Sequence, residues 1–216
     1  GNHDGSGAIK ENTLLFEQER ELATAYWQEH QPNLNFVDPT HFPFYYSFKQ
    51  NDIFFLVWDA STAQISPKQL SWIEATLQSD QAQQAAARIV LGHLPFYPVA
   101  KRKNRPGEYL KDSQKLRSLL ERNRVLMYVS GHHHVYYPGR MSKLLLFHAG
   151  ALGQGERELI TGGLLPSKTI TAIDLDLSKS ELSYTTYNAT TWQQISMEQL
   201  PSFIPSRDGK IWRHDL

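Results

Sequence analysis

The stretch Arg88-Ile89-Val90-Leu91-Gly92-His93 is a short apolar run that ends in a glycine and a histidine. Residues 125–134 repeat this arrangement, because the apolar residues from Val125 to Val129 lead into Gly131-His132-His133-His134. Short apolar runs of this kind are typical of strands buried within a sheet. Since a segment with a helical pattern lies between the two runs, the sequence predicts an α/β fold in which strands and helices alternate.

Three helices are predicted around these strands. Ser66 and Gln69 have the spacing of a capping box, and Pro67 suits the first helical position. Asp112 is a candidate cap for a second helix. An amphipathic helix is also predicted over residues 11–30, where apolar side chains recur at helical spacing, namely Leu15, Leu22 and Tyr26.

Two further segments have the pattern of antiparallel hairpins. Residues 44–49 and 53–58 flank a polar Gln50-Asn51 turn, and the second arm is continuously apolar, which predicts burial on both of its faces. Residues 169–175 and 181–185 form a later pair around the turn Ser178-Lys179-Ser180. The prediction is therefore an α/β fold with a late antiparallel addition.

The composition of the chain is that of an ordinary globular protein. Its 216 residues are predicted to form a single domain, with a core over about 1–187 and a C-terminal tail over 188–216. Lys plus Arg and Asp plus Glu both number 22, so no net charge indicates a nucleic-acid-binding surface. No apolar run reaches the roughly 18 residues of a membrane span. There is no cysteine, so any metal ion must be bound through nitrogen and oxygen atoms.

Three short motifs carry the residues that could act in chemistry: Gly1-Asn2-His3-Asp4, Gly92-His93 and Gly131-His132-His133-His134. The second and third follow predicted strands, and ligands of α/β proteins bind beyond the carboxyl ends of strands. Imidazole nitrogens and an amide oxygen suit zinc, manganese or iron. In an extended segment His132 and His134 would point the same way, and His133 would point away as a spacer. A glycine before a histidine lets the backbone come close to a ligand.

The ordered combination of these motifs resembles the last three signature motifs of the calcineurin-like metallophosphoesterases. Tyr46-Ser47-Phe48, residues 55–59 and residues 69–77 are similar to the purple-acid-phosphatase-like branch. The resemblance extends over about residues 1–150 and implies an αββα sandwich. It also implies two divalent or trivalent metal ions (manganese, iron or zinc) in the complete protein.

The resemblance implies a role for each matched residue. Asn2, His93 and His132 resemble ligands of the second metal, and His134 resembles a ligand of the first. His3 matches the general acid, and Asp4 would orient and stabilise its imidazole. The implied reaction is hydrolysis of phosphate mono- or diesters by a metal-bridging hydroxide, with His3 protonating the leaving group.

The upstream D-x-H and G-D motifs of the family do not occur in this sequence. They would supply the remaining ligands, the bridging carboxylate and the first strands. We therefore expect that the sequence begins inside a longer protein, that its sheet is incomplete, and that one ion or none binds to this chain alone. An exposed sheet edge would favour self-association. The alternative function is a non-catalytic, truncated fold that binds a partner or a phosphate ligand.

Two features of the sequence allow more than one interpretation. Lys101, Arg102, Lys103 and Arg105 form either a solvated loop tip or a basic patch that attracts an anionic ester. His148 follows an apolar strand and is interpreted as a structural histidine, with a role behind the site as the alternative.

Overall fold

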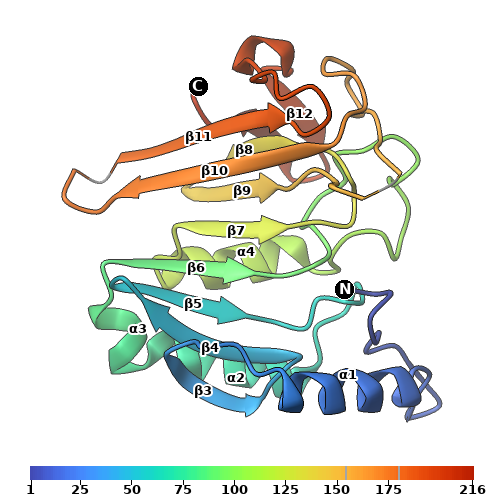
Figure 1. Ribbon diagram of the computed structural model, residues 1–216, viewed down its shortest axis with the longest axis vertical. Coiled ribbons are helices and arrows are strands. Elements are labelled where there is room, and N and C mark those ends of the chain that lie inside the picture. The colour runs from blue at the N-terminus through green and yellow to red at the C-terminus, as the bar shows by residue number, and fades with distance from the viewer. Residues whose placement is uncertain (154, 180) are drawn as a thin grey trace.

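The computed structural model describes residues 1–153, 155–179 and 181–216. Its centre is a nine-stranded sheet within this part of the chain, with the order β12-β13-β8-β9-β7-β6-β5-β4-β3 (Figure 1). The pairs β5–β6, β6–β7 and β7–β9 are parallel, and the remaining pairs are antiparallel. The strands are β3 (Phe36–His41), β4 (Tyr45–Gln50), β5 (Ile53–Val57), β6 (Ala87–Leu91), β7 (Met127–Ser130), β8 (Tyr137–Met141), β9 (Leu144–His148), β12 (Phe203–Ser206) and β13 (Gly209–Arg213).

Helices and a second sheet lie on opposite faces of the central sheet. Figure 1 shows α2 and α4 behind it and the β10–β11 hairpin across its front, beside β8 and β9. The helices are α1 (Glu17–Glu29), α2 (Pro67–Gln78), α3 (Asp80–Gln84), α4 (Ser113–Arg122) and the short 3-10 helix η1 (Met197–Gln199). The remaining strands are β1 (Ile9–Lys10), β2 (Thr13–Leu14), β10 (Thr169–Asp176) and β11 (Glu181–Asn188). This layering confirms the predicted α/β fold class.

None of the helices in the described ranges is long and apolar enough to cross a membrane.

Strand β5 is buried on one face more than on the other. Phe54 and Leu56 are fully buried, whereas Ile53, Phe55 and Val57 are half-buried. The prediction that this arm is buried on both faces was therefore wrong. The reason is the position of the β10–β11 hairpin, which covers β8 and β9 and does not extend over β5 (Figure 1). The front of β5 therefore packs against side chains of the neighbouring strands. Phe55, for example, stacks on Phe48 of the neighbouring strand with a centroid distance of 4.7 Å.

Helix α1 forms as predicted, but it does not contribute to the core. None of its side chains is buried, and Leu22 and Tyr26 are 66% and 54% exposed. Contacts of the Arg20 side chain attach the helix to the rest of the protein instead. Its Nη1 donates to the carboxylate of Asp59 at 2.9 Å, and its guanidinium lies 3.5 Å from the ring centre of Phe44.

One of the two predicted helix caps forms, and the other does not. Ser66 accepts a hydrogen bond from the backbone nitrogen of Gln69 at 3.2 Å, as predicted. The side chain of Gln69 does not return to Ser66; its Oε1 accepts from Asp59 N at 2.6 Å, and its Nε2 donates to Asp59 O at 3.1 Å. Asp112 has a left-handed φ of 56° and makes no capping hydrogen bond to α4. Helix α2 is thus tied directly to the loop that follows β5.

The chain after residue 168 supplies both an added hairpin and sheet strands. β10 and β11 pair in the predicted antiparallel way, although the predicted turn residue Ser180 lies outside the described residues. Within residues 188–216, β13 pairs with β8 and so extends the central sheet, with β12 at its edge. The other edge strand is β3. The edge strands contain Pro205 and Pro39, a residue type that natural sheets place at edges. The domain limits, the incomplete sheet and self-association through an edge stay predictions.

We expect the substitution Gln69→Ala to lower the free energy of unfolding by about 1–3 kcal/mol, because two backbone groups of Asp59 lose their partner. Urea denaturation followed by tryptophan fluorescence measures the loss. The matched control is Gln78→Ala on the exposed side of the same helix, which should change stability by less than about 0.5 kcal/mol. Equal losses in the two variants would contradict the contact between α2 and Asp59.

Candidate functional site

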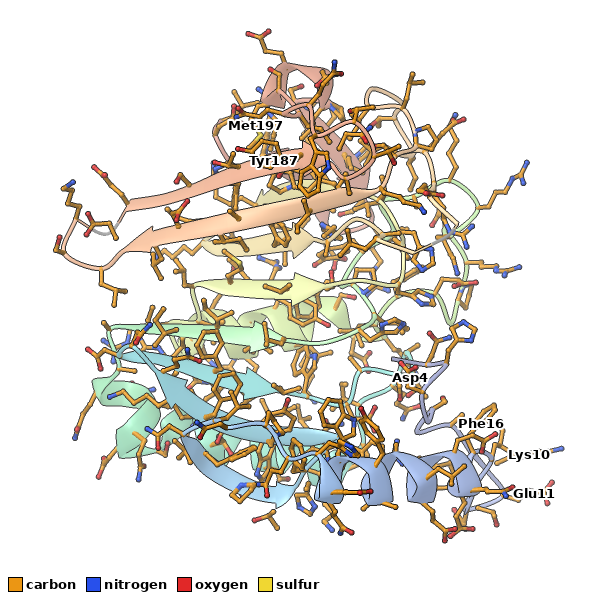
Figure 2. All side chains as sticks on the ribbon, viewed as in Figure 1. Asp4, Lys10, Glu11, Phe16, Tyr187 and Met197 are labelled. Carbon is orange, nitrogen blue, oxygen red and sulfur yellow. The ribbon has the colours of Figure 1, made fainter. Side chains whose placement is uncertain are left out.

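Two parallel strands bring the histidine motifs to one edge of the sheet. β6 and β7 pair in register, with Leu91 opposite Val129. The segments after them, beginning at Gly92 and Gly131, therefore leave the sheet side by side. The first residues of the chain approach the same edge, where Figure 2 labels Asp4. The predicted convergence of the three motifs beyond the strand ends is confirmed.

The convergence joins three side chains directly. His93 Nε2 lies 2.7 Å from Asn2 Oδ1, and His132 Nδ1 lies 3.2 Å from His93 Nε2. The rings of His93 and His132 meet edge to face, with centroids 5.0 Å apart. Burial, aided by the positive charges of the amino terminus and of His132, lowers the pKa of His93 to about 4. At neutral pH this imidazole is therefore uncharged and able to bind a cation.

Sequence reasoning missed Glu108, which binds the far side of His132. The distance from His132 Nε2 to Glu108 Oε2 is 2.8 Å, and the Glu108 side chain is only 13% exposed. Lys103 Nζ donates to the same oxygen at 2.6 Å, and Arg105 donates to Oε1 at 2.8 Å. Burial alone would raise the pKa of Glu108, but the hydrogen bonds from Lys103, His132 and Arg105 lower it to about 2. The sequence shows the charged residues around residue 105. It does not show that Glu108 pairs with His132, which lies 24 residues further along the chain.

His133, predicted to be a spacer, is fully buried and hydrogen-bonded at both nitrogens. Val99 N donates to Nδ1 at 3.3 Å, and Nε2 lies 2.9 Å from the carbonyl oxygen of Glu108. Burial lowers its pKa to about 3. These two hydrogen bonds tie the loop over residues 99–108 to the segment that follows β7.

The backbone of this segment is not the extended strand that the sequence suggested. His132 and His134 have left-handed φ angles of 60° and 52°. His134 Nδ1 lies 3.0 Å from Gly155 O, so this side chain is held by a different loop from the one that holds His132. The alternation of an extended chain does not apply here, because the chain turns at each of these residues. That both rings face one pocket stays a prediction. The predicted metal-ligand role of His134 stays a prediction.

His3 and Asp4 lie at the entrance of the cluster. The His3 side chain is exposed, and within the described residues it makes no hydrogen bond to Asp4. The carboxylate of Asp4 instead accepts from the amino group of Gly1 at 2.7 Å, a contact that lowers the pKa of Asp4. Their pairing as acid and orienting carboxylate also stays a prediction.

The donor atoms in the cluster fit part of the coordination sphere of one cation. Within residues 1–153, 155–179 and 181–216, no group of three or more His, Cys, Asp or Glu side chains is placed to hold a metal ion. The cluster of Asn2, His93 and His132 offers two imidazole nitrogens and one amide oxygen. This set suits a borderline cation such as zinc or manganese, with further ligands required. A cavity of about 500 Å³ opens beside His93 and reaches Asp4, Phe44, Trp58 and Asp59.

Three of the four cationic side chains in the loop over residues 101–105 form ion pairs, and they share two carboxylates. Lys101 pairs with Glu158, and Lys103 and Arg105 pair with Glu108. The loop therefore contributes to the structure of the site and is not simply a positively charged surface exposed to solvent. His148 is buried, with its Nδ1 3.2 Å from the carbonyl oxygen of Tyr137, which agrees with a structural role.

The comparisons with known proteins agree with this geometry. The family described as calcineurin-like phosphoesterase matches residues 1–136 of the chain. A purple acid phosphatase from seeds of yellow lupin (Lupinus luteus) is similar in structure, with a TM-score of 0.64 and 17% identity over 91% of this chain and 38% of the lupin chain. GAP50, the anchor in the inner membrane complex of Plasmodium, is similar with a TM-score of 0.50 and 15% identity over 71% of this chain and 51% of that one. None of the curated proteins matches this chain.

A mixed α/β sheet with histidine-bearing loops at the carboxyl ends of its parallel strands is the architecture that places a ligand site beyond those ends. The chain belongs to the calcineurin-like phosphoesterases. It spans 38% and 51% of the lengths of the two similar structures, and at these identities the likeness to them concerns the fold.

The two glycines before the histidines have different surroundings. A Cβ atom on Gly92 would overlap Trp58 Nε1 and the Tyr128 hydroxyl, whereas the nearest atom to one on Gly131 would be His93 Nδ1 at 3.9 Å. Trp58 Nε1 donates to Tyr128 Oη at 3.1 Å, and Tyr128 Oη donates to Leu94 O at 2.6 Å. Gly92 is therefore required by buried aromatic packing, and not by close approach of a ligand as the sequence suggested.

We expect Gly92→Ala to lower stability by about 1–3 kcal/mol, because the new methyl group displaces Trp58 and Tyr128. Chemical denaturation measures the loss, and near-ultraviolet circular dichroism reports the disturbed rings. Gly153→Ala is the control, since a Cβ atom there meets open space. An unchanged aromatic spectrum in Gly92→Ala would show that the packing argument is wrong.

Proposed function

We propose that this chain provides metal ligands and a proton donor for the hydrolysis of phosphate mono- or diesters. The observation that carries the proposal is the contact of Asn2, His93 and His132 across distances of 2.7 and 3.2 Å. These three residues come from segments separated by 91 and 39 positions, and a purely structural role does not require their polar atoms to face one another at the sheet edge. Membership of the calcineurin-like phosphoesterases supports the same reaction class.

The chain's own residues have distinct parts in this proposal. Asn2, His93 and His132 would hold one cation, and His134, two residues after His132, would serve a second in the complete protein. Such cations, when bound, supply activation of water and neutralisation of phosphoryl charge. Burial lowers the pKa of His93 to about 4, so its imidazole is uncharged at neutral pH, as a metal ligand must be.

His3 is the proposed proton donor to the leaving group. Its exposed side chain lies one residue from the ligand Asn2. Asp4 follows His3 directly in the sequence, and its carboxylate would support an imidazolium on His3. Proton donation of this kind contributes about 10²–10⁴-fold to rate.

A second candidate function is binding without catalysis. It is favoured by the absence, within the described residues, of a group of three or more His, Cys, Asp or Glu side chains around one point. One structural relative is described as an anchor in a membrane complex and not by an enzymatic activity. In this alternative the chain would bind a partner or a phosphate group through the same edge of the sheet.

Metal content after manganese loading and desalting separates the two candidates. We expect one manganese ion per wild-type chain and a loss of that ion in His132→Ala, because the variant removes one of three converging ligands. The control His30→Ala changes an exposed histidine far from the cluster in sequence and should keep the ion. Equal manganese contents in wild type and His132→Ala would contradict the ligand assignment and favour the binding role.

The acid role of His3 is tested with esters of different leaving groups. We expect His3→Ala to lower kcat for an alkyl phosphate ester by about 10²–10⁴-fold, because an alkoxide needs a proton to depart. The loss should be much smaller for an aryl ester, whose phenolate leaves without protonation. Full turnover of the alkyl ester by His3→Ala would remove the acid role while leaving the metal site intact.

A further inference from the structure

We propose that Glu108 is the positioning residue of His132: its carboxylate binds the Nε2–H group and thereby turns the Nδ1 lone pair toward Asn2 and His93. The inference rests on the proposed function, since it concerns how a ligand of that site is oriented. Glu108 belongs to none of the three histidine motifs, and it reaches the site from the loop between β6 and α4.

The positions of the hydrogen atoms follow from the partners of Glu108. Its Oε1 accepts from Arg105 at 2.8 and 3.0 Å, and its Oε2 accepts from Lys103 at 2.6 Å. A carboxylate held by two cationic side chains is an acceptor only. Lys103 Nζ also lies 3.4 Å from His132 Nε2, which is long for a hydrogen bond, whereas Glu108 Oε2 lies 2.8 Å from the same nitrogen. The shorter contact with the carboxylate places the ring hydrogen on Nε2.

The second ring nitrogen of His132 is thereby left as a lone pair. Nδ1 lies 3.2 Å from His93 Nε2, which in turn lies 2.7 Å from Asn2 Oδ1. The neutral imidazole has one donor and one acceptor nitrogen, so a hydrogen on Nε2 makes Nδ1 the atom presented to the cluster. A carboxylate behind a ligating histidine also raises the basicity of the ligating nitrogen.

Glu108 is itself fixed at a second point. The carbonyl oxygen of Glu108 accepts from His133 Nε2 at 2.9 Å, while His133 Nδ1 accepts from Val99 N at 3.3 Å. Consecutive histidines thus bind the side chain and the backbone of one glutamate. His133 is fully buried, so this attachment is shielded from water. The arrangement limits movement of the carboxylate relative to the His132 ring.

Glu158 offers a matched comparison on a neighbouring loop. It is also paired with a lysine, Lys101, but its side chain is 50% exposed and its contacts do not include His132. Substitution of Glu158 removes a carboxylate and an ion pair of the same kind without touching the proposed function of Glu108.

The first experiment reads the tautomer of His132 directly in the metal-free full chain. Histidine side chains labelled with ¹⁵N are observed by long-range ¹H–¹⁵N correlation, and the His132 signals are assigned by their loss in His132→Ala. We expect hydrogen on Nε2 in the wild type and in Glu158→Ala. Glu108→Ala should show a mixture of tautomers, and Glu108→Gln should keep most of the wild-type form, because its amide oxygen can still accept from Nε2–H.

The second experiment measures the affinity for Mn²⁺ by titration calorimetry. We expect Glu108→Ala to bind about 10–100-fold more weakly than the wild type, the range typical for loss of a partner behind a ligand. Glu108→Gln should lose less, and Glu158→Ala should bind as the wild type does.

The two readouts separate failure of this inference from failure of the proposed function. Hydrogen on Nδ1 of His132 in the wild type overturns the inference without any variant, so poor folding of Glu108→Ala does not prevent a decision. An unchanged tautomer in a folded Glu108→Ala overturns it as well. A wild-type chain that binds no Mn²⁺ overturns the proposed metal site, while the tautomer still decides whether Glu108 positions His132.

Discussion

The parallel pairing of β6 with β7 is the constraint on which the candidate site depends. Parallel strands end at the same edge, so the segments that follow Leu91 and Val129 start beside each other although the residues are far apart in sequence. The buried hydrogen bonds from Trp58 to Tyr128 and from Tyr128 to Leu94 stabilise that edge next to His93. The position of the histidines is thus a consequence of core packing.

Much of the support for the site comes from residues outside the proposed ligand set. Gln69 of α2 holds the backbone of Asp59 after β5, and Ser61 Oγ accepts from Gly7 N at 2.9 Å, which joins the first residues of the chain to the same loop. Glu108 and His133 hold the loop after β6 against the segment after β7. Buried polar groups with complete hydrogen bonding make such loops rigid, and a ligand set is effective only if its supporting contacts are rigid.

The loop over residues 101–108 contains several charged side chains, although the whole chain has no net charge. Lys103 and Arg105 were open to interpretation as a surface that attracts phosphate esters, but both are bound to Glu108. A carboxylate with these neighbours stays ionised and can order a histidine at the same time. The number and sign of the charged residues in a loop sequence do not show this pairing, because the pairing depends on which side chains come into contact in the folded protein.

The sequence by itself determined the order of elements and the three motifs. Apolar runs, proline positions and glycine–histidine pairs are local signals, so the α/β class, the hairpin of β4 and β5 and the meeting of the motifs beyond the strand ends could be predicted from them. The ligand set Asn2, His93 and His132 was implied by the resemblance to the calcineurin-like metallophosphoesterases and stays a prediction. The strands β12 and β13 and the exposure of α1 could not, since both depend on which surface the segment finds to pack against.

Only the tertiary structure decided the surroundings of each motif residue. It turned His134 toward Gly155 and brought Glu108 to His132. The physical reason is that backbone turns and long-range ion pairs set side-chain direction at a strand end, where the alternation of an extended chain no longer applies. The motif therefore specifies the residue types, and the fold determines which atom of each residue faces the site.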